Sequence, residues 1–147
     1  MKPRILLADD HAVVRFGLRA LLEISGLEVV AEAGEGREAL RLAEQLAPDV
    51  AIMDIAMPGL NGIDATELLR AKSPRTRIVI LSMYADSEHV HRAFAAGASA
   101  YLLKGSASED IVSAVRQVMV GRRYVSPELS LLDPVRSPSG ASPPIST

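Results

Sequence analysis

Short runs rich in valine, isoleucine and leucine alternate along the chain with longer stretches whose apolar residues recur three and four positions apart. The short runs predict β-strands at residues 4–8, 27–33, 50–53, 77–82 and 100–103. Three of these runs are nearly all apolar, which is typical of strands in a parallel sheet covered by helices on both faces. The pattern therefore predicts a buried sheet between two layers of helices.

The longer stretches predict five α-helices, at about residues 10–25, 36–46, 61–73 and 86–97, and from residue 106 onward. Asp10, Asn61 and Asp86 carry side chains that can cap a helix N-terminus. Ser106, with Glu109 three residues later, has the spacing of a capping box. Five strands and five helices in strict alternation predict a doubly wound α/β fold. In such folds the functional site lies at the carboxyl ends of the strands.

Composition narrows the class of protein without changing this picture. The chain has 147 residues, of which 48% are hydrophobic, and this suits one globular domain with a substantial core. Its net charge of -2 provides no positive field for a phosphate backbone, so we do not expect this chain alone to bind DNA. The absence of cysteine excludes disulfides and thiolate metal sites and favours a cytoplasmic location. No apolar run approaches the ~20 residues of a membrane helix, so no membrane association is expected.

The composition changes near the C-terminus. Five of the nine prolines follow Val125, and residues 137–147 show no hydrophobic periodicity. We therefore expect the domain to span residues 1–124 and residues 125–147 to form a linker or disordered tail. After Leu132 no further pair of amphipathic helices is found.

Polar residues occur where four of the predicted strands end: Asp9 and Asp10, then Asp54, Ser82 and Lys104. Taken singly, Asp10 is explained as a helix cap, Ser82 as a turn hydroxyl and Lys104 as a solvated surface charge. Asp54 is harder to explain in this way, because an acid at the end of a buried strand is costly without a charged or metal partner. We expect all five groups to converge at one edge of the sheet.

Three neighbouring carboxylates require a cation. Two like charges 4 Å apart repel by about 4 kcal/mol at an effective dielectric constant of 20, so a single lysine cannot neutralise this group. A site made of oxygen ligands suits Mg²⁺, which also masks the charge of an incoming phosphoryl group. An oxygen of Asp54 could then attack phosphorus and form an acyl phosphate. Lys104 and the Ser82 hydroxyl would bind phosphoryl oxygens.

The segments ILLADDH, IMDIAMPGLNG, VILSMYAD and AYLLKG, in this order and spacing, resemble the receiver domain of bacterial two-component response regulators. The resemblance covers residues 3 to about 123. With DDHAVVR near the start and GRRYVSPELS near the end, the chain is most similar to the NarL/FixJ branch, whose receivers precede a LuxR-type helix-turn-helix. The resemblance implies a five-stranded parallel sheet with the flavodoxin-like (CheY-like) order 2-1-3-4-5 and five flanking helices.

The resemblance also implies the chemistry of the site. It implies phosphorylation of Asp54 by a sensor histidine kinase. It further implies Mg²⁺ bound by Asp9, Asp10, Asp54 and the backbone carbonyl of Ala56. A domain of this kind is a phosphoacceptor with self-catalysed phosphotransfer and slow autodephosphorylation, because Ala56 has no side chain that could orient an attacking water.

A switch involving Ser82 and Tyr101 is the third implication of the resemblance. In the family the residue at position 82 moves toward the phosphoryl group and the aromatic residue at position 101 turns inward. This changes the surface formed by the fourth helix, fifth strand and fifth helix, which would control homodimerisation and, through an output domain missing from this chain, DNA binding and transcription. From the residues alone, a half-buried core aromatic explains Tyr101 equally well.

Two features depart from the family pattern. The lysine is often followed there by a proline in a cis bond, whereas Lys104 is followed by Gly105, which leaves the isomer open. The helix-turn-helix is also missing. His11 could approach the acid pair, although an exposed histidine in the first helical turn is the simpler interpretation.

Three alternative functions are also compatible with parts of the sequence. The segment GEGREA at residues 34–39 fits a dinucleotide-binding fingerprint, but it follows the second strand rather than the first. An aspartate-nucleophile phosphatase usually carries a second acid two residues after the nucleophile, where this chain has Ala56. A purely structural interaction domain without phosphorylation is the third alternative.

Overall fold

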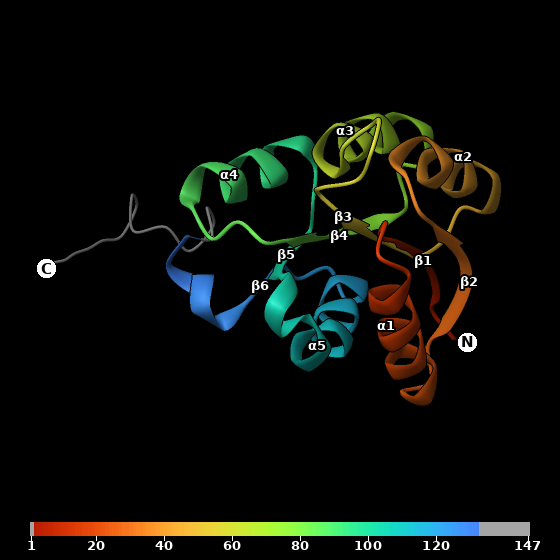
Figure 1. Ribbon diagram of the computed structural model, residues 1–147, viewed down its shortest axis with the longest axis horizontal. Helices are drawn as coiled ribbons and strands as arrows, with labels where there is room; N and C mark the ends of the chain where they lie inside the picture. Colours follow the sequence, from red (N-terminus) through yellow and green to blue (C-terminus); the bar gives the residue numbers. More distant parts are fainter. Residues whose placement is uncertain (1, 133–147) are drawn as a thin grey trace, which may run out of the picture.

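The computed structural model describes residues 2–132 and shows a parallel sheet between two layers of helices (Figure 1). The six strands are β1 (Arg4–Ala8), β2 (Glu28–Ala33), β3 (Val50–Asp54), β4 (Arg77–Ser82), β5 (Ala100–Leu103) and β6 (Tyr124–Val125). Their order in the sheet is β2-β1-β3-β4-β5-β6. The predicted order of the first five strands is confirmed, and β6 is an addition at the β5 edge.

Five α-helices cover the two faces of the sheet. They are α1 (Ala12–Ile24), α2 (Gly36–Leu46), α3 (Gly62–Lys72), α4 (Ser87–Ala96) and α5 (Ala107–Met119). Two 3-10 segments, η1 (Lys104–Ser106) and η2 (Pro127–Leu132), precede and follow α5. Figure 1 shows α1 and α5 on one face and α2, α3 and α4 on the other. Of these helices, none is long and apolar enough to cross a membrane within the part of the chain that the structure describes.

Alternation along each strand builds a core on both faces of the sheet. In β1, Ile5 and Leu7 belong to the cluster under α1 and α5, whereas Leu6 belongs to the cluster under α2, α3 and α4. In β3, Ile52 belongs to the cluster under α1 and α5, and Met53 belongs to the cluster under α2, α3 and α4. Because both faces are covered, both sets of side chains must be apolar. The nearly continuous apolar runs are explained by this arrangement.

The local helix signals were only partly right. Asn61 and Asp86 cap α3 and α4 as predicted, because their side chains accept hydrogen bonds from backbone N–H groups three residues later. The cap predicted at Asp10 is wrong: α1 begins after His11, and no side chain caps it. The capping box predicted at Ser106 is also wrong, since η1 precedes α5 and the Ser106 side chain makes no cap bond.

The fold continues past the boundary expected at residues 124 and 125. That boundary falls inside β6, which pairs in parallel with β5 through Tyr124 and Val125. Ser126 and Leu129, further along, are buried. Two residues of strand are too short for the alternation of apolar and polar positions to reveal. The tail expected at residues 137–147 lies outside the described residues.

Glu32 on β2 provides a pH-dependent contribution to stability. Its carboxylate accepts hydrogen bonds from Arg19 at 2.5 Å and Arg15 at 3.0 Å. The hydrogen bond from Arg19 is the main cause that lowers the pKa of Glu32 below its ordinary value of 4.5. We expect Glu32→Gln to lower the free energy of unfolding at neutral pH by about 0.5–1 kcal/mol, because the pair is partly exposed.

The sign of this pH dependence follows from the lowered pKa. The stabilisation is present above the unfolded pKa of Glu32 and is lost as pH falls through the lower folded value. Urea unfolding of the parent and Glu32→Gln should therefore show a difference that shrinks as pH falls below 4.5. Glu44→Gln is the control, since Glu44 is exposed and 3.8 Å from Lys72. A difference for Glu32→Gln that grows on acidification would contradict the expectation.

Candidate functional site

The predicted polar groups meet at the carboxyl edge of the sheet. Asp9 follows β1, Asp54 ends β3, Ser82 ends β4 and Lys104 follows β5. Parallel strands deliver these residues to the same edge, and the order of the sheet reverses at β1, which lies between β2 and β3. Ser82 and Lys104 line one open hollow of about 500 Å³. The side chains thus converge as expected from strand direction.

Asp54 is the buried acid of the group, with 2% of its surface exposed. Its Oδ2 accepts a hydrogen bond from Lys104 Nζ at 2.9 Å, and its Oδ1 accepts one from the Ala56 backbone N–H at 3.1 Å. Burial raises the pKa of Asp54, and the hydrogen bond from Lys104 opposes this rise. Both oxygens are oriented by donors, which holds the carboxylate in one position.

Lys104 joins the carboxylates that follow β1 and β3. Its Nζ lies 2.9 Å from Asp9 Oδ2 and 2.9 Å from Asp54 Oδ2, and only 11% of its side chain is exposed. Burial lowers the pKa of Lys104, but the hydrogen bonds with Asp54 and Asp9 outweigh it, so that the pKa is raised. The lysine is therefore a fixed positive charge. The peptide bond to Gly105 is trans.

The acid pair after β1 offers oxygen ligands beside Asp54. Asp9 is completely buried, and its Oδ1 accepts a hydrogen bond from the His11 N–H at 2.7 Å. Its Oδ2 forms an ion pair with Lys104 Nζ at 2.9 Å, so Asp9 and Asp54 share this one ammonium. One ligand atom each from Asp9, Asp10, His11 and Asp54 lie within 4.8 Å of one another. A cluster of carboxylate oxygens that outnumber the ammonium beside them suits a hard cation.

His11 lies closer to the site than its sequence position indicated. The side chain is 61% exposed, yet Nδ1 lies 3.0 Å from Lys104 Nζ and 3.1 Å from Asp10 Oδ1. Its place directly after the acid pair was the only sequence signal for this contact. His11 is therefore exposed to solvent and also in contact with the site.

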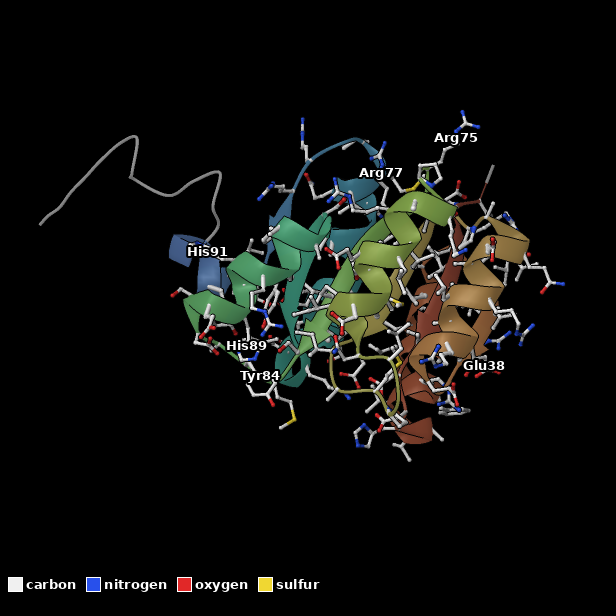
Figure 2. All side chains as sticks on the ribbon, turned by 90° about the horizontal axis from the view of Figure 1, so that it is seen from above. Glu38, Arg75, Arg77, Tyr84, His89 and His91 are labelled. Atoms are coloured by element: carbon white, nitrogen blue, oxygen red, sulfur yellow. The ribbon has the colours of Figure 1, made fainter. Side chains whose placement is uncertain are left out.

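Ser82 and Tyr101 bind the same loop residue. The Ser82 Oγ accepts a hydrogen bond from the Tyr84 N–H at 2.9 Å, and the Tyr101 hydroxyl donates to the Tyr84 carbonyl at 2.7 Å. Tyr101 is fully buried rather than half-buried, and burial raises its pKa. The Tyr84 ring stacks on His89 with ring centroids 4.0 Å apart (Figure 2). The inward side chain of Tyr101 thus fixes the loop after β4.

Comparison with known proteins decides the family. Residues 5–116 match the family model of the response regulator receiver domain. The chain belongs to this family. It is 41% identical over 128 residues to the response regulator GacA of Pseudomonas aeruginosa, covering 86% of this chain and 60% of that protein. This receiver domain therefore spans less than two thirds of the length of that relative.

Two solved receiver structures agree with the fold. A LuxR-family response regulator from Aurantimonas sp. SI85-9A1 is 41% identical with a TM-score of 0.84, covering 88% of this chain and 94% of that chain. The receiver domain of the NarL regulator from Mycobacterium tuberculosis is 35% identical with a TM-score of 0.79, covering 82% of this chain and 98% of that chain. The predicted resemblance to the NarL/FixJ branch is confirmed.

The receiver family and strand order remove the dinucleotide alternative. The fingerprint at residues 34–39 follows β2, which is the edge strand of the sheet and lies away from the reversal at β1. Its Gly36 has a packing role instead, because a Cβ there would overlap the Leu60 backbone. Close contact with the loop before α3 therefore explains the glycine at position 36.

Gly62 is a residue of the receiver site that the sequence argument missed. It begins α3, and its N–H donates to the Ile55 carbonyl at 3.0 Å. A Cβ at this position would overlap the backbone carbonyl of Asp54. A glycine directly after a helix cap, where a better helix former is usual, was the available signal. The start of α3 therefore supports the Asp54 backbone directly.

Proposed function

We propose that this receiver domain accepts a phosphoryl group from a sensor histidine kinase on Asp54 in a Mg²⁺-dependent reaction. The observation that carries the proposal is the contact of Lys104 Nζ with Asp54 Oδ2 at 2.9 Å beside the buried Asp9, which shares the same ammonium. A nucleophilic carboxylate, a fixed ammonium and neighbouring acid oxygens are the groups that phosphoryl transfer to an aspartate needs.

The acid residues fit a magnesium ion. Asp9, Asp10, Asp54 and the carbonyl of Ala56 would hold it, since carboxylate and carbonyl oxygens are its preferred ligands. When bound, Mg²⁺ supplies positive charge that offsets the carboxylates and the phosphoryl oxygens. The single ammonium that Asp9 and Asp54 share supports this assignment, because Lys104 alone leaves negative charge at the site uncompensated.

The side chains have separate roles in the transfer. An Asp54 carboxylate oxygen forms a bond to phosphorus while the bond from phosphorus to the donor's leaving group breaks, which leaves an acyl phosphate. Lys104 binds a phosphoryl oxygen, and the Ser82 hydroxyl donates its hydrogen to another. Ala56 is exposed and carries only a methyl group. Hydrolysis of the acyl phosphate should therefore be slow, and the domain is a phosphoacceptor rather than a turnover enzyme.

Ser82 and Tyr101 would transmit the modification. Both hold Tyr84 at the start of the loop before α4. If Ser82 moves to the phosphoryl group, its hydrogen bond with the Tyr84 N–H breaks. The Tyr101 hydroxyl would keep its hydrogen bond with the Tyr84 carbonyl. The surface of α4, β5 and α5 would change as a result. In a longer protein this would control dimerisation and the DNA binding of an output domain.

Mass spectrometry after incubation with acetyl phosphate and Mg²⁺ tests the proposal. We expect the parent to gain the mass of one phosphoryl group and Asp54→Asn to gain none, because the amide cannot act as the nucleophile. Asp64→Asn is the matched control, since Asp64 lies exposed on α3, and it should gain one group. Removal of divalent ions by EDTA should prevent uptake. No gain in the parent, or an equal gain in Asp54→Asn, would overturn the proposal.

A further inference from the structure

The chain after α5 returns to the sheet and is held against β5 by Ser126. The Ser126 N–H donates to the Tyr101 carbonyl at 3.0 Å. The Leu103 N–H donates to Ser126 Oγ at 2.8 Å. Pairing of β5 with β6 ends at Val125, so this hydroxyl takes the place of the next backbone acceptor. Ser126 is completely buried, and its two hydrogen bonds reach Tyr101 and Leu103, the residues before and after Leu102 in β5.

Leu129 is a second point of attachment. Only 4% of its surface is exposed, and it belongs to the same hydrophobic cluster as Tyr101, Phe94 and Val90. Its N–H donates to the Ser126 carbonyl at 2.7 Å, which links the two attachments. Figure 1 shows η2, in blue, beside the β6 edge of the sheet and below α4. The segment of residues 124–129, called the strap below, therefore bridges β5 and the helix expected to switch.

The strap also reaches the site. Leu103, whose N–H binds Ser126, directly precedes Lys104, the partner of Asp54. Glu128 of the strap lines the same open hollow as Ser82 and Lys104. Without the Ser126 hydroxyl, the Leu103 N–H would lose the acceptor that the structure provides, and a partly buried donor without a partner is unfavourable.

We propose that the strap holds β5 in the position from which Lys104 reaches Asp54 and Tyr101 stays buried, with Ser126 as a positioning residue. The proposal rests on the function proposed for Asp54. Because coupling between two sites is reciprocal for binding free energies, binding of a phosphoryl group at Asp54 tightens the strap. Loosening the strap weakens the site in return. The state of Asp54 thereby reaches the segment that follows α5.

Two measurements on the 147-residue chain test the strap, with Ser108→Ala, an exposed serine on α5, as the matched control. The first is amide hydrogen exchange by NMR in the unmodified protein. Ser126→Ala should accelerate exchange at Leu103 and Lys104 by about fivefold or more, the equivalent of the roughly 1 kcal/mol cost of a buried donor that loses its acceptor. The amides of β1 should keep their parent rates, which separates local release from general loss of stability.

The second measurement is the initial rate of phosphoryl uptake from acetyl phosphate at a temperature where every variant is folded. Ser126→Ala and Leu129→Ala should both lower the rate, because Lys104 is then held less firmly beside Asp54. For Ser126→Ala we expect about fivefold or more, the equivalent of the roughly 1 kcal/mol cost of an unsatisfied buried donor. Ser126→Thr, which keeps the hydroxyl, should recover the rate. A purely structural serine would change the melting temperature without this pattern.

The outcomes separate the two proposals. If the parent takes up phosphate and Ser126→Ala matches Ser108→Ala in both measurements, the strap inference is wrong. If the parent takes up none, the function proposed for Asp54 has failed, and the exchange measurement alone decides on the strap. Faster exchange at Leu103 and Lys104 with unchanged β1 amides would then support it, and unchanged exchange would overturn it.

Discussion

Lys104→Met is expected to destabilise the domain by about 3–5 kcal/mol, the usual cost of removing one partner from a buried ion pair. The lysine is the single cation among the described residues that lies within ion-pair distance of both Asp9 and Asp54, whose side chains are 0% and 3% exposed. Methionine keeps the length and apolar character of the stem but leaves two buried carboxylates without compensation. Phosphoryl uptake at Asp54 should be lost as well, because the phosphoryl oxygens lose their ammonium partner.

Urea unfolding in the absence of divalent ions measures this effect. Lys72→Met is the matched control, because Lys72 is 45% exposed and lies 3.8 Å from Glu44, and it should change the free energy of unfolding by less than about 1 kcal/mol. Adding Asp54→Asn to Lys104→Met should restore part of the stability without restoring uptake. Equal stability of Lys104→Met and Lys72→Met would show that the buried charges are compensated in some other way.

Gly62→Ala should have the second largest effect. The new methyl group would overlap the backbone carbonyl of Asp54 and approach Ile55 Cα to 2.9 Å. Neither backbone atom can move without displacing the end of β3 or the start of α3, so we expect a loss of about 1–3 kcal/mol, as for other overpacked positions. Asp54 would shift away from Lys104, and phosphoryl uptake should slow.

Gly17→Ala is the matched control for this substitution. Gly17 lies inside α1, and a Cβ there would have no atom within 4 Å. The same change should therefore stabilise the domain by about 0.5–1 kcal/mol, because alanine favours the helix over glycine. Urea unfolding and the initial rate of phosphoryl uptake check both variants. A Gly62→Ala protein as stable and as active as the parent would contradict the close packing of α3 on Asp54.

Prediction from the sequence worked best where one strand could be treated by itself. The apolar run ending at Asp54 identified β3 to within one residue, because a strand covered on both faces must be apolar throughout. The meeting of Asp9, Asp54 and Lys104 followed from the parallel direction of their strands. These inferences needed no knowledge of side-chain contacts.

The helix caps predicted from short sequence patterns were wrong where the same side chains make tertiary contacts. Asp10 was expected to cap α1, but no side chain caps that helix. The Asp10 carboxylate lies 3.1 Å from His11 Nδ1, among the possible metal ligands of the site, instead. The capping box at Ser106 was displaced by the 3-10 turn that carries Lys104 into the site. At both positions a polar side chain had several available partners, and the arrangement of the strand ends determined which one it took.

The sequence by itself determined the alternation of strands and helices, the identity of the acids and the lysine, and the edge of the sheet where they meet. Only the tertiary structure decided that Asp9 and Asp54 share the Lys104 ammonium, that Tyr101 is fully buried and that Gly62 packs on the Asp54 backbone. It also placed Ser126 against β5, beyond the boundary expected at residue 124. The physical reason is that hydrophobic periodicity specifies which face of an element is buried. Hydrogen bonds and close contacts depend on distances between residues far apart in the chain.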